Sequence, residues 1–577
     1  MIYPQNFETK IGFDEIRDLL KQRCLSTLGK GKVDDMAFSS DADEIKEWIE
    51  QTREFRHIQD GADDFPLQYF FDVRDAIKRI RLENTHLEES ELFDLRRSLQ
   101  TINDIVRYLN RAEDKGEDVD PAPLYPALYR LTQDVATYPQ LVQGIDQILD
   151  KFGHIRDNAS PELLNIRREL ARAESSVSKT LYSILRSAQS EGLVDKDVTP
   201  TLRDGRLVIP VMPGMKRKIS GIVHDESATG KTVFIEPSEV VEANNRIREL
   251  ESEERHEIIR ILTTFTNKVR PHSRDILESY SFLATIDFIR AKAELAKLTK
   301  AIEPEITDKP HVDWIQSRHP LLQLSLEKQG KKVVPLDIIL NKDKHILIIS
   351  GPNAGGKSVC LKTVGLLQYM VQCGLSIPVG DRSTVGIFDN VMIDIGDEQS
   401  LENDLSTYSS HLLNMKNMMR QANNKTIILI DEFGTGTEPQ IGGAIAEAVL
   451  EQFCNKGAWG VITTHYQNLK HFADSHEGVA NGAMLYDRHE MRALFQLAIG
   501  RPGSSFAIEI ARKTGLPEEV IQKASEIVGS DYIQSDKYLQ DIVRDKRYWE
   551  AKRQTVHQRE KDLERQIAKY ESDVAEL

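Results

Sequence analysis

A glycine-rich turn followed by a lysine and a serine lies in the middle of the chain. The segment reads HILIISGPNAGGKS over residues 345–358, and its last eight residues fit the pattern G-x-x-x-x-G-K-[ST]. In such a turn, glycines let consecutive backbone N–H groups point at an anion, and the following helix presents its positive end to the same anion. Lys357 can reach the β- and γ-phosphates of a nucleotide, and the Ser358 hydroxyl can ligate Mg²⁺. The pattern therefore predicts a binding site for a nucleoside triphosphate.

Two acidic residues at the end of an apolar run could supply the hydrolytic chemistry. The run is IILIDE over residues 427–432. At the end of a strand, Asp431 can hold Mg²⁺ through water, and Glu432 can polarise the attacking water. A later apolar run, GVITTHY over 460–466, ends near His465. This histidine is expected to sense the γ-phosphate by hydrogen bonding.

A serine and a threonine could add to the site from another part of the chain. They open the motif STYSSH over 406–411. Hydroxyl and backbone N–H groups at a helix start can donate to an anion, and the same residues can also cap the helix. The predicted nucleotide-binding residues are Gly351, Pro352, Asn353, Ala354, Gly355, Gly356, Lys357, Ser358, Ser406 and Thr407. The predicted catalytic residues are Lys357, Glu432 and His465, and the predicted metal ligands are Ser358 and Asp431.

Such a site requires strands that end at one edge of a sheet and helices that begin beside them. An apolar run over 346–349 leads into the glycine-rich turn, and the residues after Lys357, VCLKTVGLLQYM, have helical spacing. Further apolar runs alternate with helical stretches; they are VMIDIGD (391–397), TIILIDEFG (426–434), GVITTHY (460–466) and ALFQLAIG (493–500). This alternation predicts an α/β domain with a parallel sheet flanked by helices.

The N-terminal half of the chain has helical periodicity, apart from one β-rich segment. Helical blocks are expected near 43–59, 72–82, 88–112, 140–151 and 160–190. Pro161 should lie in the first turn of the last block. Three β-rich runs follow at 206–211, 219–224 and 232–235, separated by Gly and Pro. Residues 238–300 then return to a long charged helix, which suits a lever or an antiparallel arm.

Basic residues gather in the β-rich segment although the chain as a whole is acidic. The net charge is −16 and the pI is about 5.5, so nucleic-acid binding would need a local basic surface. The candidates are Arg203, Arg206, Lys216, Arg217, Lys218 and Lys231. They could contact phosphates or could simply solvate a hairpin, and the sequence leaves both readings open.

The C-terminal region has two helical patterns. Residues 514–529, TGLPEEVIQKASEIVG, form a compact helical unit in this interpretation. From about 537 to 577 apolar residues recur at alternating three- and four-residue steps, which favours a coiled coil over a single amphipathic helix. The chain stops within this pattern, so we expect it to be a truncated form of a longer protein.

Composition argues against several other classes of protein. The four cysteines form no C-x-x-C pair, which argues against a disulfide framework or a zinc site. The N-terminus, MIYPQNFETK, lacks a signal-peptide core, and no apolar run reaches transmembrane length. We therefore expect a cytoplasmic protein that does not use a membrane.

Taken in order, GPNAGGKS, STYSSH, DEFGTGTEP and TTH resemble the ATPase domain of the MutS superfamily, a branch of the ABC-type ATPases. NFETKIGF, LRDGRLVIPV, DIGDEQSLENDLSTYSSH and IGRPGSSFAIEIA resemble more narrowly the second bacterial MutS family, MutS-two. The resemblance spans nearly the whole chain. It implies an ATPase that uses ATP and Mg²⁺, and a fold that joins all-α arms to an α/β domain.

The resemblance also implies an arrangement of domains. These are a helical core over 1–197, a small β segment of the core over 198–237, and a helical lever or clamp arm over 238–305. A P-loop ATPase domain follows over 306–513, then a helical dimerisation element over 514–536 and a coiled coil over 537–577. Two ATPase domains would pack head to tail as a homodimer, with Ser406 and Thr407 of one subunit facing the γ-phosphate held by Lys357 of the other. Residues 434–437 would lie at the same seam.

One departure from mismatch-reading MutS proteins concerns specificity. Those proteins insert a Phe-x-Glu wedge into DNA from an N-terminal α/β domain. Here Phe13, Asp14 and Glu15 match the spelling, but Asp14 is expected to cap a helix and Phe13 to lie in a core. We therefore expect no recognition of single mismatches. The Smr nuclease-like region usual in the family is not expected within these residues, so nuclease activity is not expected in this chain.

Three functions fit these patterns. The first is a dimeric ATPase that clamps branched or recombination-intermediate DNA and suppresses recombination. The second, from the same resemblance, is an ATPase that binds ribosomal RNA on collided ribosomes and splits the subunits. The third is a structural coiled-coil ATPase that bridges DNA segments, although STYSSH and DEFGTGTEP fit MutS better.

Overall fold

The computed structural model describes residues 1–61, 64–67, 71–112, 122–203, 205–352, 355–396, 407–487, 492–503 and 507–528. Asn353, Ala354, Ser406, the Thr407 side chain and the predicted coiled coil lie outside the described residues. The chain divides into two compact units. The first contains Met1–Cys24, Lys30–Asp60 and the chain from Phe288 onward, and the second contains Leu25–Gly29 and Gly61–Asp287.

The first unit is built on a seven-stranded sheet. Its strands, in spatial order, are β1 (Ile2–Tyr3), β11 (Asn390–Asp394), β12 (Thr426–Ile430), β13 (Trp459–Thr463), β9 (Ile346–Ser350), β14 (Val479–Asp487) and β15 (Arg492–Ile499). Every neighbouring pair is parallel except β14 and β15. The central strands are buried throughout, which explains their continuous apolar runs.

The sequence predicted a parallel sheet that includes the run 493–500. This prediction is wrong for that run, because it forms β15, which pairs antiparallel with β14. Asp487 and Arg492 are separated by only four residues. A parallel connection needs a crossover of a dozen residues or more, whereas a short connection can join only antiparallel neighbours. The strand β14 itself has no counterpart among the predicted runs.

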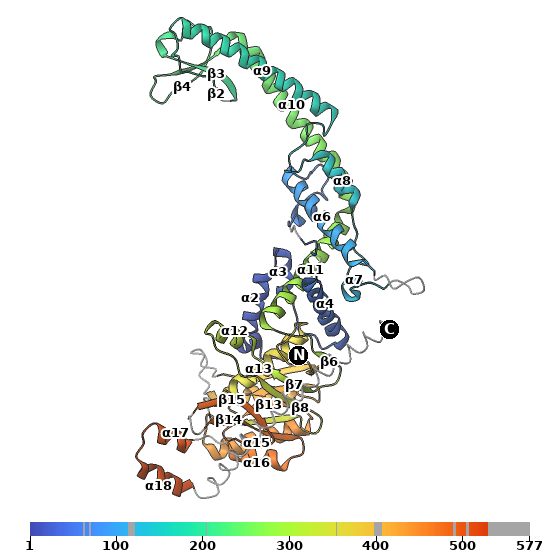
Figure 1. Cartoon of the computed structure of the whole chain (residues 1–577), viewed down its shortest axis with the longest axis vertical. Helices are drawn as coiled ribbons and strands as arrows, with labels where there is room; N and C mark the ends of the chain where they lie inside the picture. Colours follow the sequence, from blue (N-terminus) through green and yellow to red (C-terminus); the bar gives the residue numbers. More distant parts are fainter. Residues whose placement is uncertain are drawn as a thin grey trace, which may run out of the picture. The chain divides into compact units, whose positions relative to one another are not determined.

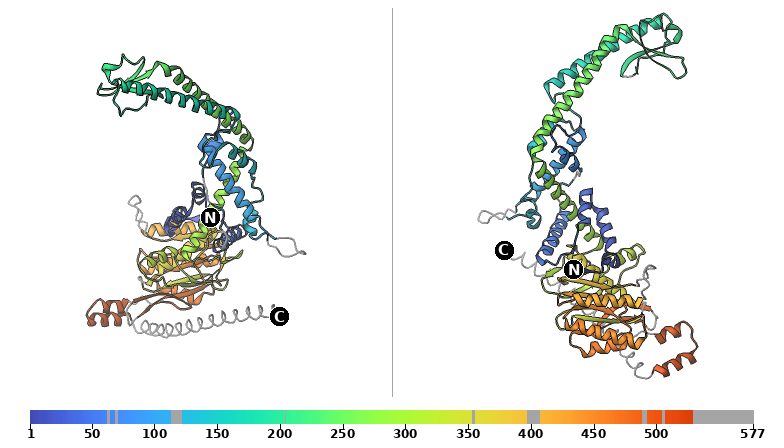
Figure 2. Two further views of the ribbon diagram at one scale, coloured as in Figure 1. Left: turned by 45° about the horizontal axis from the view of Figure 1, so that its top comes forward. Right: turned by 180° about the vertical axis from the view of Figure 1, so that it is seen from behind.

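Helices cover both faces of this sheet (Figures 1 and 2). They include α13 (Lys357–Gln372), α14 (Thr407–Gln421), α15 (Pro439–Asn455) and α16 (Gln467–Ser475). Successive residues of β9 point to opposite faces: Leu347 packs in the core that contains α13, and Ile348 in the core that contains α15 and α16. The helix predicted from the spacing after Lys357 is confirmed: it is α13, which packs on one face of the sheet.

The first residues of the chain belong to this same unit. The strand β1 pairs with β11, and the helices α1 (Phe7–Ile11) and α2 (Phe13–Arg23) follow. Phe13 is fully buried, and its ring meets that of Tyr369 in α13 edge to face at 4.7 Å between centroids. The prediction that Phe13 is a core residue is confirmed. The helix begins two residues earlier than expected, however, with Gly12 at the N-cap (φ 80°) and Asp14 within the first turn.

Other elements complete the first unit. A second sheet has the order β6 (Glu305–Thr307), β10 (Thr384–Gly386), β7 (Val312–Ser317) and β8 (Leu336–Leu340), and α12 (Pro320–Lys328) follows β7. The helix α4 (Ala42–Asp60) packs in the core with α13. Near the end of the described chain lie α17 (Ala507–Lys513) and α18 (Glu518–Val528), and only α18 falls within the compact helical unit predicted over 514–529. The predicted domain boundaries stay predictions, although the two compact units group residues 1–24 and 30–60 with the chain after 288.

The second unit is largely helical, as its periodicity predicted. It contains α5 (Arg74–Arg79), α6 (Glu89–Leu109), α7 (Pro126–Arg130), α8 (Pro139–Ile148), α9 (Pro161–Ser190) and α10 (Ser238–Val269). Pro161 opens α9, and the Ser160 hydroxyl accepts from the Leu163 N–H at 3.0 Å. The expected single helix over 238–300 is instead two helices, α10 and α11 (Ser273–Thr299). A short turn containing Pro271 separates them, because proline cannot continue the hydrogen-bond ladder.

A four-stranded sheet occupies the predicted β-rich segment, beside the paired helices α9 and α10 (Figure 1). Its order is β2 (Thr201–Arg203), β3 (Arg206–Val211), β5 (Val233–Pro237) and β4 (Gly221–Glu226). The Glu236 carboxylate is fully buried and is bound by Arg206 at 2.7 Å, His224 at 2.5 Å and Asn244 at 2.7 Å. Burial alone would raise the pKa of Glu236, but these partners outweigh it and the pKa is lowered.

No helix among the described ranges is long and apolar enough to cross a membrane.

Replacing Phe13 by alanine should lower the free energy of unfolding of the first unit by about 3–5 kcal/mol, since it removes a fully buried ring from the core. Urea unfolding followed by fluorescence measures the change. Phe152, which is 69% exposed, gives the matched control, and its alanine variant should unfold like the wild type. A Phe13→Ala variant of unchanged stability that lost affinity for mismatched DNA would instead make Phe13 an exposed wedge.

Candidate nucleotide-binding site

The glycine-rich turn joins the end of β9 to the start of α13. Gly351 has φ 143° and Gly356, at the N-cap of α13, has φ 91°, which is backbone that favours glycine. A Cβ on Gly351 would come within 3.1 Å of Met484, and one on Gly355 within 3.2 Å of Pro352. A side chain at Gly351 or Gly355 would therefore be crowded, and the described backbone of the turn fits a close approach to phosphate.

Lys357, the first residue of α13, is only 3% exposed. Its ammonium donates to the Gly351 carbonyl at 2.8 Å and lies 3.3 Å from Nε2 of His465. Burial lowers the pKa of Lys357 to about 8, although the nearby carboxylates of Glu432 and Asp431 act in the opposite direction. A cation withdrawn from water in this way gains most from a bound anion. Ser358 follows in the same first turn of α13.

The acidic pair follows β12 directly, and the end of β13 holds it in place. The Thr463 hydroxyl donates to Oδ1 of Asp431 at 2.5 Å and accepts from the backbone N–H of Glu432 at 2.8 Å. Glu432 adopts φ 48°, a left-handed conformation that is uncommon for a residue with a side chain, and it is exposed. Local strain of this kind is typical of functional sites. The turn therefore separates the two acids, with Asp431 tied to β13 and Glu432 reaching outward.

His465 lies just beyond β13, beside the lysine of the turn. The neighbouring Thr464 N–H donates to the Ile349 carbonyl at 3.1 Å, which ties this end of β13 to β9. Burial, followed by the positive charges of Lys357 and Lys470, lowers the pKa of His465. The ring is therefore neutral near pH 7, and its Nε2 can accept from Lys357. The structure thus brings together Lys357 and His465, which are far apart in the sequence.

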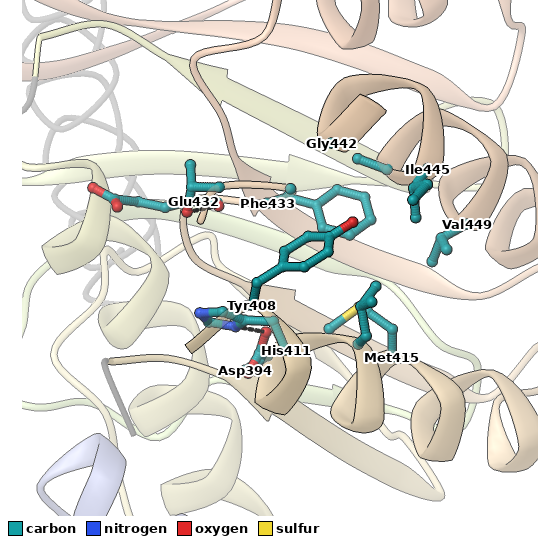
Figure 3. Close-up of a pocket in the computed structure, with 13 residues that line it drawn as sticks. Asp394, Tyr408, His411, Met415, Glu432, Phe433, Gly442, Ile445 and Val449 are labelled. Carbon is teal, nitrogen blue, oxygen red and sulfur yellow. Dashed lines mark hydrogen bonds and ion pairs between the residues drawn. The ribbon is translucent and has the colours of Figure 1, made fainter. Parts of the chain in front are cut away.

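The helix α14 begins at Thr407, the second residue of the predicted serine–threonine motif. Its first turns border a pocket, which Figure 3 shows between α14, α15 and the segment after β12. The lining residues are Asp394, Tyr408, His411, Leu412, Met415, Glu432, Phe433, Gly434, Thr435, Gly442, Ile445, Ala446 and Val449. Glu432 and the first turns of α14 therefore share one pocket. The position of Ser406 lies outside the described residues.

One aromatic residue beside the turn escaped the sequence analysis. Phe495 of β15 has φ 55° and is 49% exposed, and its ring lies 3.1 Å from where a Cβ on Gly356 would be. A bulge places it there, because Met484 pairs with Leu497 while Tyr486 pairs with Ala493. Bulges re-aim side chains, but their position depends on strand pairing. The run ALFQLAIG carries no local signal for it.

A second buried lysine supports the same region and was also missed. Lys470 of α16 is 6% exposed and donates to the Gly503 carbonyl at 3.0 Å, and the Gly503 N–H donates to the Ser350 hydroxyl at 2.7 Å. Burial lowers the pKa of Lys470. This chain of contacts holds the residue at which β9 ends and the turn begins.

Comparison with known proteins places this geometry in a family. The protein-family model described as MutS domain V matches residues 347–530 of this chain. Three curated relatives, each named Endonuclease MutS2, come from Geobacillus sp. (strain WCH70), Enterococcus faecalis and Levilactobacillus brevis. They are 38%, 35% and 35% identical to this chain over 90%, 93% and 95% of its length.

The chain covers 64%, 66% and 68% of these three relatives, so it spans about two thirds of their length. Other relatives, such as the one from Geobacillus thermodenitrificans at 35% identity, are covered to 70%. The likeness thus extends over most of the chain and is not confined to the glycine-rich turn and the acidic pair. This chain belongs to the MutS2 family.

Proposed function

We propose that this chain is a Mg²⁺-dependent ATPase that works as a homodimer and uses ATP to clamp and release a nucleic-acid target. One observation carries the proposal: the ammonium of Lys357 is buried in a glycine turn, in contact with His465 and within the field of Asp431 and Glu432. A polyphosphate with a divalent cation is the ligand that satisfies all these charges at once.

The described residues suggest distinct roles at the phosphates. ATP supplies the phosphoanhydride bond, and Mg²⁺ would be held by the Ser358 hydroxyl and the Asp431 carboxylate, typically with water. Lys357 holds the β- and γ-phosphates, where water exclusion strengthens its charge interaction. The Thr463 hydroxyl keeps Asp431 oriented, as partners of metal ligands commonly do.

Glu432 is the proposed base that orients and deprotonates the attacking water. Its backbone is held at φ 48° by the N–H bond to the Thr463 hydroxyl, and its side chain is exposed rather than paired in the core. The Figure 3 view shows this side chain pointing away from the ring of Tyr408. His465, neutral and in contact with Lys357, would respond to the γ-phosphate through a hydrogen bond.

The dimer is proposed from the family and from the apolar surface around α14 and α15. Ser406 and Thr407 of one subunit would face the phosphates held by Lys357 of the other, with residues 434–437 at the seam. Leu412 and Ile445 border the pocket and are 37% and 36% exposed, and Leu413 and Ile441 are 48% and 58% exposed. Exposed apolar side chains of this kind are suited to burial against a second copy. Tighter nucleotide contacts in the closed dimer would shift the open–closed equilibrium.

Phe495 is the proposed contact for the adenine base. Its ring lies against the Gly356 end of the turn, is half exposed, and is fixed there by a bulge and a left-handed backbone. An aromatic face offers stacking to a base, whatever hydrogen bonds the base makes elsewhere. The strain at this residue is then a consequence of aiming the ring at the site.

The proposed target is branched DNA, with the ribosome as the alternative. The β segment of the second unit exposes Arg203, Lys216, Arg217, Lys218 and Lys231, whereas Arg206 is committed to the buried Glu236. These five exposed cations fall within one short stretch of an acidic chain, and phosphate binding would use such cations. Both candidate targets carry phosphate backbones, so the choice between them needs a direct measurement.

A Glu432→Gln variant should hydrolyse ATP about 10²- to 10⁴-fold more slowly while still binding it, because only the base that activates water is removed. Steady-state turnover and equilibrium binding of a fluorescent ATP analogue measure the two effects separately. Glu451→Gln, an exposed change on α15, serves as the control and should turn over normally. Loss of ATP affinity in the Glu432→Gln variant would contradict the assignment of this residue as the base.

The same variant can identify the target, since it should hold the closed, ATP-bound dimer. Co-sedimentation with ribosomes and capture on immobilised four-way DNA junctions are compared in the presence of ATP. Enrichment on the junctions supports the DNA proposal, and enrichment on ribosomes alone would replace it with the ribosomal alternative.

Phe495→Ala should weaken ATP binding by about 1–3 kcal/mol, the usual value of stacking a base on an aromatic side chain. This corresponds to a rise of about 5- to 150-fold in the Michaelis constant, with a smaller change in kcat. Phe495→Tyr should retain affinity, and Ile499→Ala, a 39% exposed change on the same strand, provides the control. Equal loss of affinity for ATP and for inorganic triphosphate would show that the ring supports the turn rather than the base.

A further inference from the structure

The Asp394 carboxylate, at the end of β11, is bound on both oxygens by one helix. Nδ1 of His411 lies 2.6 Å from Oδ2, and Nδ2 of Asn414 donates to Oδ1 at 2.8 Å. Asp394 is only 3% exposed. Because a carboxylate only accepts, Nδ1 of His411 carries the proton in this contact. The pair joins the sheet to the first half of α14.

The connection extends to the N-terminal strand. The Tyr3 hydroxyl of β1 donates to Oδ1 of Asn414 at 2.7 Å and accepts from Nδ2 of Asn417 at 3.1 Å. The strand β1 is the parallel neighbour of β11. Two adjacent strands therefore hold one face of α14 through three polar residues spaced three apart, namely His411, Asn414 and Asn417.

Apolar packing alone does not locate the first turns of α14. Met415 and Met418 are buried against the sheet further along the helix. Nearer its start, Tyr408 and His411 line the pocket that separates α14 from α15 (Figure 3). The Tyr408 hydroxyl is buried and has no hydrogen-bond partner among the described residues. A pocket thus lies beside the helix start.

Burying a carboxylate is costly, and pairing it often only offsets that cost, so the position of Asp394 calls for a reason beyond stability. Hydrogen bonds to both oxygens restrict how the helix can rotate or slide, which apolar contacts do not. His411 lies one helical turn after Thr407, so this restriction acts directly on the helix start. Glu432 lines the same pocket from the opposite side.

We propose that the Asp394–His411 pair sets the position of the first turn of α14, which begins at Thr407, and that ATP turnover in the proposed dimer depends on that position. His411 is a positioning residue, since it acts through the helix start and not on the nucleotide. The inference rests on the proposed function, in which Ser406 and Thr407 act across the dimer.

The test separates turnover from nucleotide binding. His411→Ala should lower kcat by about 10- to 100-fold, as expected when a reacting group is misplaced by a fraction of an ångström to an ångström. Affinity for an ATP analogue should change less than about twofold, because the glycine turn and Lys357 are intact. His411→Asn should restore most of the rate, since its amide nitrogen can replace Nδ1 as the donor to Asp394. His471→Ala, an exposed histidine on α16, should behave as the wild type.

A double variant tests whether His411 acts through Ser406. If it does, Ser406→Ala and His411→Ala should each slow turnover, and the double variant should be no slower than the worse single variant. Multiplying effects would overturn the proposal, as would an equal loss of ATP affinity and rate in His411→Ala. Failure of a folded His411→Asn variant to recover activity would overturn it as well.

Failure of the proposed function has a different signature. An unaffected Ser406→Ala variant would remove the action across the dimer, and the positioning role with it. A slow Ser406→Ala variant beside a normal His411→Ala variant would overturn the positioning role alone. Circular dichroism of each variant establishes that it is folded.

Discussion

A lysine ammonium removed from water is the feature on which the described site depends. Lys357 is 3% exposed, and its ammonium contacts the Gly351 carbonyl and His465. The cost of its burial is reflected in a pKa lowered to about 8. The fold maintains this arrangement through a glycine turn that is crowded at Gly351 and Gly355. Thr463 and Thr464 tie two strand ends together, and a second buried lysine holds the start of the turn.

Sheet topology explains why residues distant in sequence meet at this lysine. The strands β12, β13 and β9 are neighbours and parallel, so their carboxyl ends deliver Asp431, His465 and the glycine turn to one edge. The next strand outward, β11, ends at Asp394, which holds α14. The N-terminal strand β1 adds Tyr3 to the same arrangement. The candidate nucleotide site and the helix that begins at Thr407 thus share one sheet.

Much of this could be predicted from the sequence, because strands buried on both faces are continuous apolar runs and the glycine turn has a local requirement at each position. The runs before Lys357, Asp431 and His465 are strands in the structure. Features that depend on pairing between strands could not be predicted. Thus β1 is only two residues long, β15 reverses direction, and Phe495 is aimed by a bulge. The contact between Asp394, in the run 391–397, and His411, in the motif 406–411, could not be predicted from their spacing in the sequence.

The claim that two subunits share each ATP is tested most directly by mixing two inactive variants, Lys357→Ala and Ser406→Ala. If a site takes its lysine from one subunit and its serine from the other, each mixed dimer contains one intact and one doubly altered site. Half of randomly assorted dimers are mixed, so the mixture should recover about a quarter of the wild-type ATPase rate. If both residues act within the same subunit, every chain keeps a defective site. The mixture would then be no more active than the average of the two variants alone, and the account would be wrong.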